Sequence, residues 1–281
     1  DKYLDLSGAF ATNKRKIQLY GGNDSYAQKW IVVKKNGKYK IISAINPNFV
    51  LDLSNATLDG GDYGIVQLYY DNGTAAQLWN FKQIYDTGTV LNIEGTEYTV
   101  IEQKGNSKAL LVANKSPYSL NYQAGPRSDG KNWNTYEGSQ IDNYLENEWY
   151  GNLSSKMKGA IQSTDIKQSS YSKEKDTSSK QEVGPNGQVY NTISRHVFIP
   201  SISEIEKIVN LENTDKLAQF LNNENIWTRD SCQNDGFGAM YLNKYYGMIR
   251  YDVMHDRMAR PAFVIDLSKI DYTVTGTVNY K

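Results

Sequence analysis

The feature that most constrains the fold is an internal repeat in the first eighty residues. The same three short elements occur twice in the same order, separated by turns rich in Gly, Asn and Asp. The first copy consists of Leu4-Asp5-Leu6, Ile17-Gln18-Leu19-Tyr20 and Gln28-Lys29-Trp30, and the second of Leu51-Asp52-Leu53, Val66-Gln67-Leu68-Tyr69 and Gln77-Leu78-Trp79. Self-similarity at a fixed period indicates a pseudo-symmetric architecture in which each copy is one structural unit.

The spacing and the residue pattern of the repeat predict β-structure. The aspartates Asp5 and Asp52 are 47 residues apart, and the glutamines Gln28 and Gln77 are 49 apart, a period that suits a unit of four short strands. Apolar and polar residues alternate over short runs between turns, which is the pattern of strands and hairpins. The leucines and tryptophans are expected to point into a shared core, and the aspartates to face the opposite side of their strands.

The repeat resembles the ricin-type β-trefoil lectin family, whose Gln-x-Trp motif is present in both copies. The resemblance covers about residues 1–83 and includes Tyr39-Lys40-Ile41-Ile42-Ser43-Ala44, which would open the second unit. A trefoil contains three such units, but only two are recognisable in this sequence, and the first lacks its opening strand. The resemblance therefore implies a partial β-trefoil domain, and we expect the chain to have been cut from a larger parent polypeptide.

The resemblance also implies two shallow sugar-binding pockets. It assigns Asp5, Gln18 and Tyr20 to one pocket and Asp52, Gln67 and Tyr69 to the other, with Gln28 and Gln77 supporting them from behind. A carboxylate accepts hydroxyl hydrogen bonds, an amide donates and accepts, and an aromatic face stacks on a pyranose ring. Ala27 and Ala76 stand where the family usually has asparagine, so one hydroxyl contact is expected to be missing from each pocket. Alternatively, the two aspartates bind backbone amides of their own turns.

The repeat ends after Phe81, and Asp86-Thr87-Gly88 indicates a boundary, so we predict a first domain at 1–85 and a second at 86–281. In the second domain, strands are expected at 97–102, 109–113 and 196–200, with further short strands from residue 226. The polar stretch 163–194 lacks periodicity and predicts a long loop.

Helical patterns also occur in the second domain, which is therefore predicted to be α+β. Two sequences can form capping boxes, Ser139-Gln140-Ile141-Asp142 and Ser201-Ile202-Ser203-Glu204, and each predicts the start of a helix. Apolar stripes at helical spacing follow the first box: Ile141, Tyr144, Leu145 and Trp149, then Leu153, Met157, Ala160 and Ile161.

Residues 135–267 resemble a domain of unknown function, DUF6273, common in surface proteins of Gram-positive gut bacteria. That domain looks related to the fold of C-type lectins and formylglycine-generating enzymes. The matching segments are Ser139 to Leu145, Val197 to Ser201, Trp227-Thr228-Arg229-Asp230 and Ala259-Arg260-Pro261-Ala262-Phe263. Thr228, Asp230 and Ala259 depart from the commoner residues at their positions.

Residues with catalytic or metal-binding chemistry are scarce. The chain has one cysteine, Cys232, and two histidines, so neither a structural zinc site nor the paired cysteines of a formylglycine-generating enzyme is expected. We predict no catalytic residue, metal or cofactor. Trp227, Arg229, Asp230 and Arg260 are the candidates for a second-domain pocket, although arginines in apolar surroundings also serve to close structural hydrogen-bond networks.

Charge and hydropathy exclude further classes of protein. Lys and Arg number 31, as do Asp and Glu, so no net field favours nucleic acid. No apolar run of about 20 residues predicts membrane insertion, and this chain begins without a signal peptide.

We predict a secreted or cell-surface bacterial protein that binds host or bacterial glycans without catalysis. The alternatives are a structural or protein-interaction module with degenerate sugar pockets, and the accessory region of a larger glycan-active enzyme.

Overall fold

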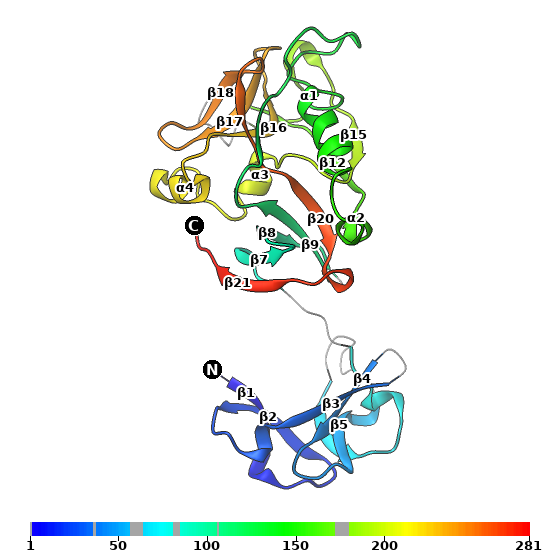
Figure 1. The fold of residues 1–281 in the computed structure, drawn as a ribbon. Coiled ribbons are helices and arrows are strands. Elements are labelled where there is room, and N and C mark those ends of the chain that lie inside the picture. Colours follow the sequence, from blue (N-terminus) through cyan, green and yellow to red (C-terminus); the bar gives the residue numbers. More distant parts are fainter. Residues whose placement is uncertain (1, 36–37, 57–63, 81–84, 106, 172–179) are drawn as a thin grey trace. The chain divides into compact units, whose positions relative to one another are not determined.

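A computed structural model describes residues 2–35, 38–56, 64–80, 85–105, 107–171 and 180–281. The chain forms two compact parts, Asp1–Lys82 and Gln83–Lys281, which we call unit 1 and unit 2. Both units are mostly β-sheet, and the described helices are few and short (Figure 1). The β-structure predicted for the first domain is confirmed.

The described strands of unit 1 form one antiparallel sheet in the order β1-β2-β6-β5-β4-β3. They are β1 Lys2–Leu6, β2 Arg15–Gly21, β3 Trp30–Lys35, β4 Lys38–Ser43, β5 Phe49–Leu53 and β6 Val66–Tyr70. The repeat is visible in the strand pairing, because β1 with β2 and β5 with β6 have the same register. Asp5 lies opposite Gln18 in the first pair, and Asp52 lies opposite Gln67 in the second.

Unit 1 has a small hydrophobic core. Its buried cluster contains Leu6, Ala27 and Leu68, and Trp30 and Phe49 pack against it while remaining partly exposed. Burial of apolar surface stabilises a fold roughly in proportion to its area, at about 25 cal/mol per Å². A cluster of this size therefore contributes little to the stability of unit 1 compared with the extensive core of unit 2.

Several apolar side chains of unit 1 are exposed. Leu4 is 37% exposed and Leu19 70%, so the prediction that all the repeat leucines point into a core is wrong for these two. The reason is that both side chains line an open surface hollow together with Ile65 and Val66, where solvent reaches them. On β3, Ile31, Val32 and Val33 are each exposed by 45% or more.

Unit 2 contains a six-stranded sheet ordered β11-β20-β9-β8-β7-β21, a seven-stranded sheet built around β16, and the pair β12-β15. Its strands are β7 Thr89–Ile93, β8 Thr96–Gln103, β9 Lys108–Ala113, β10 Tyr118–Asn121, β11 Ile161–Gln162, β12 Thr164–Lys167, β13 Ser170–Tyr171, β14 Lys180–Gln181, β15 Thr192–Arg195, β16 Ile226–Cys232, β17 Gly238–Asn243, β18 Gly247–Asp252, β19 Asp256–Ala259, β20 Ala262–Asp266 and β21 Thr273–Thr277. Its α-helices are α1 Gln140–Asn143, α2 Ser155–Ala160, α3 Ile202–Ile205 and α4 Thr214–Leu221. Within this unit, Figure 1 shows β7, β8, β9, β20 and β21 at one end and β16, β17 and β18 at the other.

The predicted helix starts are confirmed. Ser139 caps α1 by accepting a hydrogen bond from the Asp142 backbone N–H, and Ser201 and Glu204 form a complete capping box at α3. At α1 the box is incomplete, because the Asp142 carboxylate does not accept from the Ser139 N–H. It accepts from the Gly138 N–H and from Arg195 instead. The helical stripe that starts at α1 continues as a π-helical segment, Tyr144–Trp149.

Two predictions for unit 2 are wrong. The stretch 163–194 is not a loop throughout, since it contains β12 and β15, which pair antiparallel, as well as β13 and β14. These strands are only two to four residues long and mostly polar, so they leave no periodic signal. Residues 196–200 are largely buried but form no strand, and only Phe198 makes a bridge, to Ala262.

Candidate functional site

The second repeat of unit 1 holds a carboxylate between two glutamine side chains. Asp52 Oδ1 accepts a hydrogen bond from Gln67 Nε2 at 2.8 Å, and Asp52 Oδ2 accepts one from Gln77 Nε2 at 3.2 Å. Gln77 is itself fixed, because its Nε2 donates to the Tyr70 carbonyl and its Oε1 accepts from two backbone N–H groups of the preceding turn. The Asp52 carboxylate is therefore pre-oriented before any ligand arrives.

This carboxylate lies in the wall of a surface hollow. The hollow is lined by Lys14, Asp52, Gln67, Tyr69, Asn72 and Thr74, among others. Tyr69 follows Gln67 by two residues on β6, so both side chains are on the same face of the strand. A carboxylate has about four acceptor positions, and the glutamines occupy two of them. The remaining positions can accept hydrogen bonds from a ligand that enters beside Tyr69.

The first repeat builds the same arrangement. Gln18 Nε2 donates to Asp5 Oδ1 at 2.9 Å, and Gln28 Nε2 donates to Asp5 Oδ2 at 3.1 Å and to the Gly21 carbonyl at 2.8 Å. The first site is more open than the second, since Tyr20 is 54% exposed and Gln28 is partly exposed, whereas Gln77 is fully buried.

The alternative role expected for the two aspartates, binding of turn amides, is not what the hydrogen bonds show. In the described residues, Asp5 and Asp52 accept only from glutamine side chains. The structure therefore brings Asp5 together with Gln18 and Gln28, and Asp52 together with Gln67 and Gln77, through side-chain hydrogen bonds.

Some residues of the second site were missed from the sequence, namely Lys14, Asn72 and Thr74. One signal could have found the last two: Asn72-Gly73-Thr74 has a counterpart in Asn23-Asp24-Ser25 at the same 49-residue spacing as the glutamines. In both copies the Asn side-chain oxygen accepts a hydrogen bond from the backbone N–H two residues later, at 3.1 Å. This Asx turn shapes the edge of each site.

Three of the four candidate residues of unit 2 lie buried on β16, where they make structural contacts. Arg229 pairs with both Glu204 oxygens, at 2.7 and 2.9 Å, and also donates to the carbonyls of Ile199 and Lys167. Burial opposes the charge of Glu204, but the adjacent guanidinium outweighs it and holds the pKa of that carboxyl below its usual value. All the donor nitrogens of Arg229 are engaged within the protein.

Asp230 and Trp227 are engaged in the same way. The Asp230 carboxylate accepts from the backbone N–H groups of Ile202 at 2.6 Å and Ser169 at 3.1 Å. Burial raises the pKa of Asp230 to about 6, against the opposing effect of Arg229. Trp227 is fully buried and donates its indole N–H to the Leu120 carbonyl at 3.0 Å.

Arg260, the fourth candidate, caps the C-terminus of α4. Its guanidinium donates to the carbonyls of Phe220 and Leu221 at 2.9 and 2.6 Å and pairs with Glu224 at 2.8 Å. The four candidates do not line one pocket, because Arg229 and Arg260 line different hollows.

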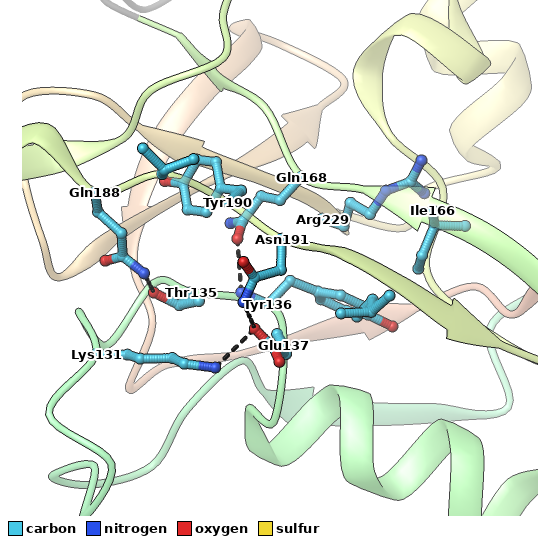
Figure 2. Close-up of a pocket in the computed structure, with 12 residues that line it drawn as sticks. Lys131, Thr135, Tyr136, Glu137, Ile166, Gln168, Gln188, Tyr190, Asn191 and Arg229 are labelled. Carbon is cyan, nitrogen blue, oxygen red and sulfur yellow. Dashed lines mark hydrogen bonds and ion pairs between the residues drawn. The ribbon is translucent and has the colours of Figure 1, made fainter.

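Figure 2 shows the hollow beside Arg229. Its polar rim is internally paired: Lys131 Nζ lies 2.7 Å from Glu137 Oε2, and Asn191 Nδ2 donates to the same oxygen at 3.1 Å. The guanidinium of Arg229 points away from Glu137 in this view. This hollow therefore offers few open hydrogen-bonding groups to a ligand.

Metal-binding clusters and membrane-spanning helices are absent from the described residues. No group of three or more His, Cys, Asp or Glu side chains in these ranges is arranged to hold a metal ion. No helix in the described ranges is both long and apolar enough to cross a membrane.

The fold and these contacts define a two-unit, mostly β-sheet protein in which unit 1 carries a duplicated Asp-Gln-Gln site. The chain belongs to the family described as Domain of unknown function (DUF6273), which matches residues 106–267, more than half of its length. No protein with a curated description matches the sequence.

Among solved structures, the chain is similar to the crystal structure of a designed 3-fold symmetric protein, ThreeFoil. Sequence identity is 24%, the match covers 39% of this chain and 69% of that chain, and the TM-score is 0.28. At this TM-score the likeness supports no conclusion about the present chain.

Proposed function

We propose that the chain is a non-catalytic carbohydrate-binding protein and that unit 1 is part of a ricin-type β-trefoil lectin module. The observation that carries the proposal is the duplication of one site, in which Asp5 and Asp52 are each held by two glutamine amides. In each copy a tyrosine follows the first of these glutamines by two residues and so lies on the same face of the strand. A pre-oriented carboxylate can accept hydrogen bonds from two sugar hydroxyls, and the tyrosine ring can stack on the pyranose.

The duplication supports a role in binding. A hydrophobic core needs the leucines and the Gln-x-Trp corners, but it does not need a carboxylate opposite a glutamine. Burying a charged group costs free energy unless it is hydrogen-bonded. Unit 1 has a small core, so two buried carboxylates with a tyrosine at each are better explained by a ligand than by stability.

A glycan array probed with the full chain tests this proposal. We expect the wild type to bind, and the Asp5→Ala/Asp52→Ala variant to lose at least tenfold in affinity for the glycans of unit 1, because hydrogen bonds to charged groups contribute about 1.5–3 kcal/mol each. Among the single variants, Asp52→Ala is expected to lose more than Asp5→Ala, since the second site is the more enclosed.

The control is Asp215→Ala, which removes an exposed carboxylate from α4 in unit 2 and should bind as the wild type does. Circular dichroism checks that each variant is folded. A folded double variant that binds every array glycan as tightly as the wild type would refute the assignment of the sites.

For unit 2, we propose a relationship to the fold of C-type lectins and formylglycine-generating enzymes. The order of its sequence motifs supports this proposal. The same resemblance supports a place outside the cell, on a Gram-positive bacterial surface protein, with a host or bacterial surface polysaccharide as the partner. Immunogold labelling of intact cells of the source bacterium tests the location, with surface label as the expected result.

One observation favours the alternative of a protein-interaction module. Ile31 and Val33, which lie on the same face of β3, are both exposed, and exposed apolar surface often marks a contact with another polypeptide. A pulldown from cell-surface extract, with and without competing free sugar, separates the alternatives. Capture that free sugar does not reduce would favour protein interaction.

A further inference from the structure

Unit 2 carries a groove walled by aromatic rings that none of the sites described above uses. It lies between β8, the segment that leads into β10, and the π-helical segment Tyr144–Trp149. Its lining includes Tyr98, Ser116, Tyr118, Tyr144, Trp149 and Asn152.

The rings of this groove are fixed by contacts within the protein. Tyr118 and Tyr144 meet edge to face, with ring centroids 5.5 Å apart and an interplanar angle of 81°. Trp149 is stacked on Phe263 from behind, at 6.1 Å and 30°. Tyr118 is 52% exposed, and Tyr144 and Trp149 are partly exposed. The groove therefore presents pre-positioned aromatic surface to solvent.

The π-helical turn explains why two of these rings share one wall. Tyr144 and Trp149 are five residues apart, a spacing that places side chains on different sides of an α-helix. The wider turn bonds residues five apart, as in the Tyr150 N–H to Leu145 carbonyl bond of 3.0 Å, and brings Trp149 back towards the side of Tyr144. Such turns are rare and often occur at functional sites.

Polar groups with free hydrogen-bonding capacity lie beside the rings. Within the described residues, no protein group accepts from the Trp149 indole N–H, and the exposed Asn152 side chain has no protein partner. An indole N–H donates, and an amide both donates and accepts. Lys115 is the one charged side chain among the described lining residues, so the groove lacks the arginine fork that suits carboxylates and phosphates.

We propose that this groove is a second carbohydrate-binding site, which takes a chain of neutral hexopyranoses. Sugars whose hydroxyls are equatorial, such as β-linked glucose and N-acetylglucosamine, present flat C–H faces that match exposed aromatic rings. Their hydroxyls and acetamide groups then meet Asn152 and the Trp149 N–H at the edge. This inference does not depend on the sites proposed for unit 1.

The test uses the full chain with Asp5→Ala/Asp52→Ala, which removes the unit 1 carboxylates, titrated with cellohexaose and with chitohexaose. We expect at least one of them to bind and to change tryptophan fluorescence, because Trp149 lies in the groove. Adding Tyr118→Ala is expected to weaken that binding by roughly tenfold through loss of a stacking surface. Tyr118 is largely exposed, so this variant leaves the core intact, whereas Trp149→Ala also removes the contact with Phe263.

Tyr245→Ala is the matched control, since Tyr245 is 71% exposed and does not line the groove. It should leave binding unchanged. The proposal is overturned if neither oligosaccharide binds the Asp5→Ala/Asp52→Ala chain, or if Tyr118→Ala and Tyr245→Ala bind equally well. Equal binding by the wild type and the double variant, lost with Tyr118→Ala, would support this groove and show that these oligosaccharides do not bind at the unit 1 sites.

Discussion

At the scale of single residues, unit 2 contains buried charges whose partners come from distant parts of the chain. Arg229 pairs with Glu204 and Arg260 with Glu224, and both arginine side chains are at most 5% exposed. A buried ion pair contributes modestly compared with apolar packing, but removal of one partner leaves an uncompensated charge in low-dielectric surroundings. These positions should therefore be sensitive to substitution.

We expect Arg260→Met to lower the free energy of unfolding by about 3–5 kcal/mol, because it leaves Glu224 without its cation and removes the cap of α4. Urea denaturation measures the change. Lys269→Met is the control, since Lys269 is 54% exposed and lies 3.9 Å from Asp266, and a surface pair of this kind contributes less than about 1 kcal/mol. Equal losses in the two variants would contradict the structural role of Arg260.

The stability that Asp230 contributes to the protein should depend on pH. Burial raises its pKa from 3.8 to about 6 in the folded state, so the folded protein binds more protons than the unfolded chain between these values. The stability that Asp230 contributes is therefore greatest below about pH 4 and falls as the pH rises to about 6.

The Asp230→Asn variant isolates this effect from that of the other carboxylates. The difference in unfolding free energy between wild type and variant should fall between about pH 4 and pH 6, as measured by urea denaturation at several pH values. A difference that is constant with pH would show that Asp230 titrates as it does in the unfolded chain.

The sequence predicted some of these side-chain contacts. Arginines in apolar runs predicted buried networks, and the repeat brought Asp5, Gln18 and Gln28 together correctly. It did not identify Glu204 or Glu224 as partners, because an ion pair between distant segments leaves no local pattern.

At the scale of helices and strands, the helix caps were the features that the sequence predicted best. The predicted capping box at Ser201 and Glu204 is complete in the structure. Such a cap can be predicted from the sequence because it depends on residues only three positions apart. The strands between 163 and 194 were not predictable, since β12 to β15 are short and are held by pairing with distant partners such as β16. The π-helical turn was also missed, because Ile141, Leu145 and Trp149 recur every four residues and so also fit one face of an α-helix.

The cap of α3 can be tested by Ser201→Ala. Ser201 Oγ accepts from the Glu204 N–H at 3.2 Å, and loss of an N-cap hydroxyl costs about 1 kcal/mol. Ser155→Ala, at an exposed position of α2, should change the unfolding free energy by less than about 0.5 kcal/mol. Thermal denaturation followed by circular dichroism compares the two, and an unchanged melting temperature for Ser201→Ala would show that the cap contributes nothing.

At the scale of the whole molecule, each described sheet is confined to one unit, and the two units carry different kinds of candidate site. Unit 1 repeats a carboxylate held by glutamines, whereas unit 2 presents fixed aromatic rings. The repeat could be predicted from the sequence because its motifs are local and occur twice. The groove could not be predicted, because Tyr98, Tyr118 and Trp149 come from separate elements that only the fold brings together.

We propose that the duplicated carboxylates of unit 1 bind glycans. To test this, the ¹⁵N-labelled full chain is titrated with the glycan whose array binding falls most in the Asp5→Ala/Asp52→Ala variant, and the side-chain amide signals are recorded in NMR spectra. We expect the signals of Gln67 and Gln77 to shift as the glycan is added, because these amides donate to Asp52. If the amide signals of Gln18, Gln28, Gln67 and Gln77 all stay in place at a saturating glycan concentration, the duplicated carboxylates do not bind that glycan.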